Sequence, residues 1–218
     1  MALPAQPQGV RMDPRVLSAM ARVPRHRFVP PAYASMAYAD RALPIGWGQS
    51  ISQPYIVAVM TSLLELQPGD RVLEVGTGSG YQAAVLAELT PHVYTVELIP
   101  ELAQAASERL RTLGYTTIRC RQGDGYCGWP EQAPFDAIVV TAAPERVPHA
   151  LLDQLKEGGR MVIPIGVAQE GQVLWRIRRL PDRMEMENIL PVVFVPMLHR
   201  PPSGGDQPPM PTHSSPSS

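Results

Sequence analysis

Apolar and polar residues alternate along the chain in blocks that predict helices and strands. Asp13-Pro14 is typical of a helix start, a capping residue followed by proline, and apolar residues at helical spacing follow it to Val23-Pro24. A second helix is predicted from Gln53-Pro54 to Pro68-Gly69-Asp70, where proline and glycine end it. Beyond residue 70, short apolar runs alternate with longer amphipathic ones, and this alternation is the main indication of the architecture.

The alternating part of the chain predicts a mostly parallel sheet. The predicted strands cover residues 71–75, 92–97, 117–121, 135–141, 160–164, 173–180 and 186–195. The predicted helices between them cover residues 81–89, 100–113 and 148–155. Strands that alternate with helices form a parallel sheet covered on both faces, and the last two strands have no helix between them. We therefore expect an α/β fold, a doubly wound Rossmann-like sheet with an antiparallel addition at one edge.

Length and composition predict a single domain with two short ends. The chain has 218 residues, and we expect an N-terminal segment over residues 1–12 and one domain over residues 13–200. Residues 201–218 are dominated by proline, serine and glycine without an apolar period, so we expect a disordered tail there.

Charge and cysteine usage exclude several classes of protein. Nineteen basic and twenty acidic side chains leave a net charge of −1, without the excess of lysine and arginine that nucleic-acid binding needs. Cys120 and Cys127 have the spacing of neither a zinc site nor a disulfide framework, and the five histidines are scattered, so no metal site is expected. Proline, glycine and polar residues interrupt the charge-free window 42–64, which argues against a membrane span. A cytoplasmic location is the default expectation.

The strongest local motif follows the strand predicted over residues 71–75. It reads Glu74-Val75-Gly76-Thr77-Gly78-Ser79-Gly80, at the point where an open parallel sheet binds ligands. A dinucleotide fingerprint would need glycine at the position of Tyr81, which disfavours NAD as the ligand. A tight turn that binds nothing is the alternative, and three alternating glycines argue against it.

Two acidic residues follow the next two predicted strands. Glu97 ends a strand where a carboxylate can accept hydrogen bonds from both ribose hydroxyls of an adenosine, although a solvated glutamate near a helix start is the alternative. Asp124 lies between two glycines at the same edge of the sheet, where a plain turn explains it almost as well. Taken together, the motifs resemble S-adenosylmethionine-dependent methyltransferases of class I. The resemblance implies these donor-binding residues: Glu74, Gly76, Thr77, Gly78, Ser79, Gly80, Glu97, Asp124 and Gly125.

Further segments resemble the protein-L-isoaspartate (D-aspartate) O-methyltransferase family. They are Val23–Val29, Leu43–Pro54, Gly123–Gly125 with Trp129, and Phe194–Met197, and the similarity covers nearly everything from Asp13 to Met197. The resemblance implies methyl transfer from S-adenosyl-L-methionine to the free carboxylate of isoaspartyl residues in damaged polypeptides, which initiates their repair. It also implies that Ser52, in an I-S-x-P segment, is the catalytic serine.

The implied chemistry needs alignment more than proton transfer. A carboxylate is ionised at neutral pH and can attack a sulfonium methyl group without a general base. Ser52 would donate its hydroxyl to one carboxylate oxygen, and the alternative is that Ser52 only caps the helix beginning at Pro54. Ile51, Ser52 and Val195 are expected to bind the substrate, because the loop 43–53 and a strand over residues 194–197 carry family motifs outside the donor-binding half.

Two other functions stay open at this stage. The first is a methyltransferase for a small molecule or a nucleic acid, although the chain lacks a basic stripe and has Thr141-Ala142-Ala143-Pro144 where an amino-methylation motif would lie. The second is a donor-binding pseudoenzyme that serves as an interaction module, with the proline-rich tail as a ligand for partners. The preferred hypothesis is a repair methyltransferase that acts as a monomer.

Overall fold

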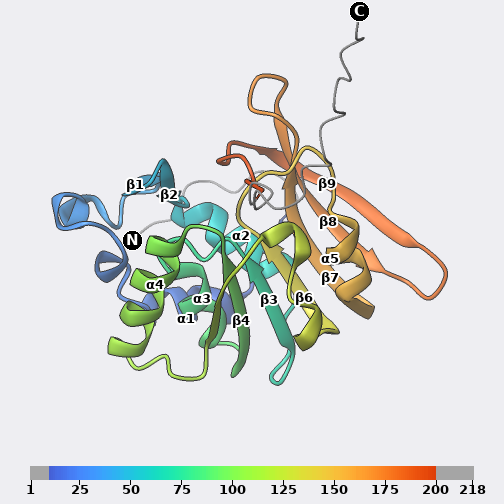
Figure 1. Cartoon of the computed structure of the whole chain (residues 1–218), viewed down its shortest axis with the longest axis horizontal. Coiled ribbons are helices and arrows are strands. Elements are labelled where there is room, and N and C mark those ends of the chain that lie inside the picture. The colour runs from blue at the N-terminus through green and yellow to red at the C-terminus, as the bar shows by residue number, and fades with distance from the viewer. Residues whose placement is uncertain (1–9, 200–218) are drawn as a thin grey trace, which may run out of the picture.

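The computed structural model describes residues 10–199, which form a seven-stranded sheet between two sets of helices (Figure 1). The strands lie in the order β5-β4-β3-β6-β7-β8-β9. Neighbours from β5 to β7 pair in parallel, whereas β8 and β9 pair antiparallel at one edge, so the expected α/β fold with its antiparallel addition is confirmed. Their bounds are β3 (Arg71–Val75), β4 (His92–Glu97), β5 (Arg119–Gln122), β6 (Phe135–Val140), β7 (Leu155–Ile165), β8 (Gln172–Arg179) and β9 (Met184–Val192).

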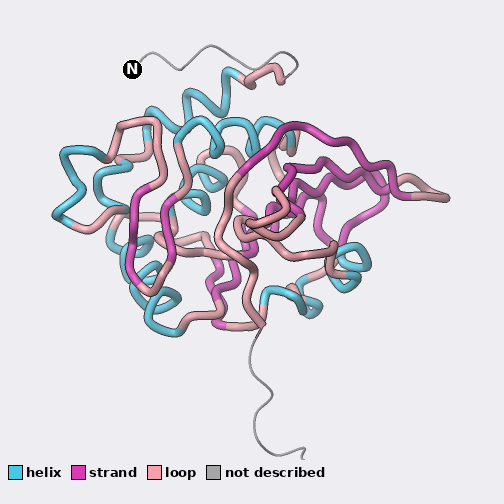
Figure 2. The backbone as a smooth tube through the Cα atoms, turned by 90° about the horizontal axis from the view of Figure 1, so that it is seen from above, coloured by secondary structure: helices cyan, strands magenta, loops and turns pink. Residues whose placement is uncertain are grey.

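Helices flank the sheet on both sides when it is seen from above (Figure 2). The α-helices are α1 (Pro14–Arg22), α2 (Pro54–Leu63), α3 (Tyr81–Ala87), α4 (Pro100–Thr112) and α5 (His149–Gln154). Short 3-10 helices are η1 (Arg25–Phe28), η2 (Pro31–Met36), η3 (Gly125–Cys127) and η4 (Pro130–Gln132). Within the described residues, none of the helices has both the length and the apolar character needed to cross a membrane.

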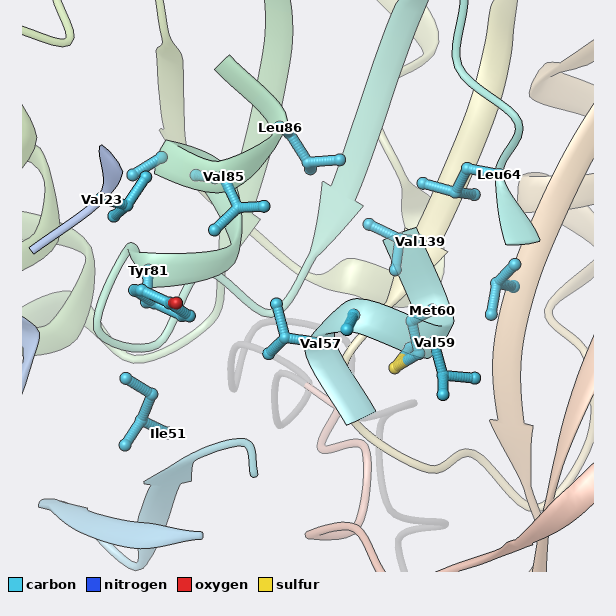
Figure 3. Packing of buried hydrophobic residues seen from close by; sticks show 14 of the residues in the cluster. Val23, Ile51, Val57, Val59, Met60, Leu64, Tyr81, Val85, Leu86 and Val139 are labelled. Carbon is cyan, nitrogen blue, oxygen red and sulfur yellow. The ribbon is translucent and has the colours of Figure 1, made fainter. Parts of the chain in front are cut away.

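Alternate residues of the central strand β3 enter two different apolar clusters, as the period of two of a strand requires. Val72 packs in the cluster that includes α1 to α4, and Leu73 and Val75 pack in the cluster that includes α5. Figure 3 shows part of the first cluster, where Val57 of α2 lies toward Tyr81 and Val85 of α3, and Met60 of α2 lies near Val139. Glu74 lies on the same side of β3 as Val72 and is fully buried, so an acidic side chain enters this apolar cluster.

The two helix starts expected near Pro14 and Pro54 are both present, but they are capped differently. Asp13 accepts a hydrogen bond from the backbone N–H of Arg15 at 2.8 Å, as a capping residue does. At α2 the capping position is held by Gln53, which makes no side-chain cap. Asp40 accepts from the Tyr55 N–H at 2.9 Å instead, so the alternative that Ser52 caps this helix is wrong.

Two segments differ from the sequence-based expectations. The loop 43–53 contains a β-hairpin, β1 (Leu43–Gly46) and β2 (Gln49–Ile51), whose turn has positive φ at Gly46, Trp47 and Gly48. The expected strand over residues 194–197 is absent, because β9 ends at Val192. Beyond it, the side chain of Gln172 replaces a partner strand by binding the backbone N–H and carbonyl of Phe194. The expected tail over residues 201–218 lies outside the described residues.

Candidate active site

Three cavities meet at the carboxyl end of β3, and Ser50 and Thr141 line all three of them. The residues that line the outer cleft include Gly76, Gly78, Glu97, Gly125, Val195 and Met197. The inner pocket lies behind it and is lined by Ser52, Glu74, Thr77, Ser79, Tyr81 and Gln82, among others. The side groove is lined by Ser52, Gln53, Ile56, Val193, Phe194 and Val195, with further residues of the same segments. The cavities lie where the chain leaves β3 and the strand order reverses, which is the usual ligand site of an open α/β sheet.

Glu97 holds the glycine loop in place at the outer cleft. Its side chain is 7% exposed, and it accepts hydrogen bonds from the Gly78 N–H at 2.8 Å and the Ile99 N–H at 3.0 Å. The alternative of a solvated glutamate is therefore wrong. Each carboxylate oxygen can accept a second hydrogen bond, so Glu97 keeps capacity for a ligand in the cleft that it lines.

Glu74 is fully buried at the inner pocket. The Thr95 hydroxyl donates to its Oε2 at 2.5 Å, so the Thr77 hydroxyl, also 2.5 Å from that of Thr95, donates in turn to Thr95. Its other oxygen, Oε1, has no hydrogen-bond partner among the described residues. Burial raises the pKa of Glu74 to about 8, and the nearby charge of Glu97 acts in the same direction. The Thr95 hydroxyl and the Ala83 amide oppose this rise in the pKa, although the Ala83 amide forms no well-aligned hydrogen bond to the carboxyl.

Thr141 binds the start of the glycine loop, and sequence reasoning did not place it in the site. Its hydroxyl lies 2.6 Å from the Gly76 carbonyl and 3.0 Å from the Val75 carbonyl, and can donate to either. Gly76 has φ +98°, and a Cβ atom there would lie 2.5 Å from the Thr141 Oγ1. A β-branched polar residue directly after an apolar strand was the available signal for Thr141.

Gly125 lies in one wall of the outer cleft, and Asp124 directly precedes it without lining the cleft. Asp124 accepts from the Tyr126 N–H at 2.9 Å and caps η3, and its Oδ2 lies 3.4 Å from the ring of His199. Gly125 lines the cleft, and a Cβ atom there would lie 2.5 Å from a methyl group of Val75. Glycine is therefore required at residue 125 by close packing against β3.

Ser52 and Ile51 follow the hairpin at the junction of the inner pocket and the side groove. Ser52 lines both cavities, and its hydroxyl has no hydrogen-bond partner within residues 10–199. Ile51 is 4% exposed and points toward Tyr81 (Figure 3), and it lines the inner pocket without reaching the side groove. Of the two residues predicted from the sequence in this loop, Ser52 is therefore accessible from the cavities and Ile51 belongs to the core.

The segment 193–198 closes the other side of the outer cleft and the side groove. The Ala143 N–H donates to the Val195 carbonyl at 2.9 Å, and the Met197 N–H donates to the Ala143 carbonyl at 2.8 Å. Val195 lines both the outer cleft and the side groove, so it lies where the two cavities adjoin. Gln172, which sequence reasoning missed, fixes the start of this segment through Phe194.

Replacing Gln172 with leucine is expected to loosen this segment. The variant leaves the N–H and carbonyl of Phe194 buried without partners, so the free energy of unfolding should fall by about 2–4 kcal/mol. Urea unfolding measures the loss, and amide hydrogen exchange at Phe194 should accelerate. Gln169→Leu, at an exposed position of the preceding loop, is the control. Equal stabilities of the two variants would contradict the assignment.

The residues near the site offer no obvious metal centre. Among residues 10–199, no group of three or more histidine, cysteine, aspartate or glutamate side chains could hold a metal ion. The polar groups that line the cavities are hydroxyls, two carboxyls, backbone amides and the side-chain amides of Gln49, Gln53 and Gln82. Such a set can bind a nucleoside and a charged group and can hold a second reactant next to them.

Comparisons with known proteins agree with this geometry. A family model described as protein-L-isoaspartate(D-aspartate) O-methyltransferase matches residues 3–201. A protein-L-isoaspartate O-methyltransferase from Gloeobacter violaceus is 55% identical over 197 residues, which cover 90% of this chain and 96% of that protein. A second relative, protein-L-isoaspartate O-methyltransferase 2 from Syntrophobacter fumaroxidans, is 58% identical over 187 residues, 85% of this chain and 76% of its own.

A solved structure shows the same arrangement. It is described as a putative protein-L-isoaspartate O-methyltransferase from Plasmodium falciparum in complex with S-adenosyl-L-homocysteine. The two chains are 26% identical with a TM-score of 0.76, over 88% of this chain and 93% of that one. The family resemblance seen in the sequence is thus confirmed, and the chain belongs to the protein-L-isoaspartate(D-aspartate) O-methyltransferase family.

Proposed function

We propose that the chain transfers the methyl group of S-adenosyl-L-methionine to the free carboxylate of L-isoaspartyl and D-aspartyl residues in damaged proteins, the step that initiates their repair. One observation carries this proposal beyond family membership: a buried donor site and an open side groove meet at Ser50, Ser52 and Thr141. A methyl group has to pass between two reactants at such a junction. A donor-binding module without activity would not need the groove.

The residues of the outer cleft and the inner pocket fit the donor. Glu97 is placed for the ribose hydroxyls, and Gly76, Gly78 and Gly125 let the backbone approach the nucleoside. Glu74 Oε1 is a buried acceptor without a protein partner, which suits the ammonium of the methionine part. Thr77 and Ser79 line the same pocket and hold its shape. Gly80 and Asp124, which the sequence also predicted for donor binding, do not line these cavities.

The acceptor would lie in the side groove. The donor supplies an electrophilic methyl group on a sulfonium. The Ser52 hydroxyl donates to one oxygen of the acceptor carboxylate and so turns the other oxygen toward the methyl group. No general base is needed because the carboxylate is ionised at neutral pH. Holding the reacting atoms in line can contribute about 7–11 kcal/mol to lowering a barrier.

Discrimination between isoaspartyl and aspartyl groups must come from the peptide backbone, because the two carboxylates are chemically alike. Val195 and Val193 line the same groove as Ser52 and can contact the chain that carries the acceptor. Ile51 lines the inner pocket and does not reach the groove, so it would affect the acceptor only through the position of the neighbouring Ser52. The two linkages differ in the position of one methylene group, and the groove can distinguish them only if its walls contact the bound chain on each side.

The proposed function is tested with two peptides that differ only in an aspartyl or isoaspartyl linkage. Labelled donor should methylate only the isoaspartyl peptide. Ser52→Ala is expected to lower kcat by about 10–100-fold, as loss of one hydrogen bond to a charged group does, while the Kd of the donor stays the same. Ser18→Ala, on the exposed face of α1, is the control. Label in both peptides or in neither would overturn the proposal.

We also propose that the chain acts as a monomer in the cytoplasm. Residues of the glycine loop, the hairpin and segment 193–198 of one chain line the three cavities, which supports the monomer as the active unit. Cys120 and Cys127 are both free, which agrees with a reducing compartment. Sedimentation of the purified protein and fractionation of cells test the two statements.

A further inference from the structure

A buried arginine lies directly behind the loop that carries Ser52. Arg25, in η1, is 1% exposed, although arginine is among the residues least often buried. Its Nε donates to the Ala37 carbonyl at 2.7 Å, and its Nη2 donates to the Ser52 carbonyl at 2.7 Å. The guanidinium therefore connects η1 and the end of η2 to the backbone of Ser52.

The same guanidinium also contacts the donor side of the site. Its central carbon lies 4.8 Å from the ring centre of Tyr81, a cation–π distance. Tyr81 is 3% exposed, begins α3 directly after the glycine loop and lines the inner pocket with Ser52. Arg25 thus lies between the loop that carries Ser52 and the helix that supports the donor-binding glycines.

The backbone on either side of Ser52 is fixed by two different charged side chains. Arg25 holds the Ser52 carbonyl, and Asp40 accepts hydrogen bonds from the Gln53 side chain at 2.8 Å and from the Tyr55 N–H at 2.9 Å. The Ser52 hydroxyl is left without a partner in the described part of the chain. Because the Ser52 backbone is fixed and its hydroxyl is unpaired among residues 10–199, the hydroxyl can bind a reactant in one defined orientation.

Packing alone does not explain a charged residue at this position. Burial lowers the pKa of Arg25, and the guanidinium has no ion-pair partner within 4.0 Å among residues 10–199. Its third nitrogen, Nη1, is buried without a hydrogen-bond partner. What the guanidinium provides at this position is therefore its two hydrogen bonds to the Ala37 and Ser52 carbonyls and its contact with Tyr81.

We propose that Arg25 is a positioning residue for methyl transfer, which sets the orientation of the Ser52 hydroxyl by holding the Ser52 carbonyl. The inference rests on the proposed role of Ser52. It assigns Arg25 no contact with either reactant. Its effect should therefore appear in kcat and should depend on the presence of the serine hydroxyl.

Arg25→Met tests the proposal, because methionine fills similar space and donates no hydrogen bond. We expect kcat with the isoaspartyl peptide to fall by about 10-fold, while the Kd of the donor changes little. The melting temperature should fall, as in the control below, because the Ala37 and Ser52 carbonyls lose their donor. Arg25→Lys keeps the charge but cannot reach both carbonyls with a fork, so its kcat should lie between those of the parent and Arg25→Met. Arg160→Met is the matched control, since Arg160 uses Nε and Nη2 in the same way on the Leu64 and Glu65 carbonyls at the far end of α2. The control should lose stability and keep kcat.

A double-mutant cycle separates this inference from the proposed function. In the Ser52→Ala background, Arg25→Met should lower kcat by less than 2-fold, because no hydroxyl remains to be oriented. If Ser52→Ala alone leaves kcat unchanged, the proposed role of Ser52 fails. If Ser52→Ala lowers kcat but Arg25→Met costs the same in both backgrounds, or nothing in the parent, the positioning role is wrong. Should Arg25→Met not fold, the same cycle with Arg25→Lys decides the question.

Discussion

Gly76→Ala is expected to abolish measurable binding of the donor and to destabilise the fold. The new Cβ atom would lie 2.5 Å from the Thr141 Oγ1, a separation that real Cβ atoms do not show, so one of the two segments must move. Thr141 then loses its hydrogen bond to the Gly76 carbonyl. Because both residues line the outer cleft and the inner pocket, the displacement falls on the donor site. We expect the Kd of S-adenosylmethionine to rise by more than 100-fold.

The backbone conformation adds a second cost that a control can isolate. Gly76 has φ +98°, and an alanine at positive φ costs about 1–2 kcal/mol. Gly114→Ala carries the same kind of cost, since Gly114 has φ +87° and a Cβ atom there would meet no heavy atom within 4 Å. With the steric conflict added, Gly76→Ala should lose about 2–4 kcal/mol of unfolding free energy against about 1 kcal/mol for the control. Calorimetric titration and urea unfolding measure the two quantities.

A second substitution checks whether Thr141 is the cause. Thr141→Ala removes the Oγ1 atom, and the next nearest atom to the new Cβ, the Thr141 Cβ, lies at an ordinary 3.7 Å. The double variant should therefore regain part of the stability that Gly76→Ala loses, while the strain of positive φ remains. Additive losses in the double variant would show that the close approach to Thr141 is not what makes glycine necessary.

The sequence predicted the parallel strands and the glycine loop because local patterns specify them. A short apolar run such as β6 and the alternation of β3 with α3 need no information from distant residues. The cap of α1 was likewise predictable from the sequence, since Asp13 and Arg15 are only two residues apart. The cap of α2 could not be read from neighbouring residues, because the Tyr55 N–H at its start is bound by Asp40, more than ten residues earlier in the chain.

The parts of the site that sequence reasoning missed depend on contacts over long separations. Gln172 replaces a strand for Phe194, and Thr141 meets Gly76 only because β3 and β6 pair in parallel. The segment 194–197 has strand-like composition but pairs only at an isolated bridge between Ala143 and Pro196. Arg25 lay in a recognised family motif, yet its contact with Ser52 follows from the fold alone.

Glu74→Gln is expected to remove a pH dependence from both stability and donor binding. The pKa of Glu74 is raised from 4.5 to about 8 in the folded protein, so the folded state holds a proton that the unfolded state releases. Between these two pKa values the folded state binds more protons, and its free energy of unfolding therefore falls as the pH rises. The slope for one such group is about 1.4 kcal/mol per pH unit.

The variant should gain stability over the parent as the pH rises from 6 to 8, because glutamine has no proton to lose. Urea unfolding at pH 6, 7, 8 and 9 measures the difference, which should grow by on the order of 1 kcal/mol per pH unit and level off above pH 8. Glu108→Gln, on the exposed face of α4, is the control and should follow the parent at every pH. Parallel curves for the parent and Glu74→Gln would contradict the raised pKa.

Donor binding should respond in the opposite direction. If Glu74 Oε1 receives the ammonium of the methionine part, the ionised carboxylate is the binding form, and the donor Kd of the parent should fall as the pH rises toward 8. A hydrogen bond to a charged group contributes about 1.5–3 kcal/mol, so Glu74→Gln should weaken binding by about 10–100-fold at pH 8 and make the Kd independent of pH. A Kd that keeps its pH dependence in the variant would assign the ammonium to another partner. The buried carboxyl would then act only through Thr95 and Thr77, as a support for the glycine loop.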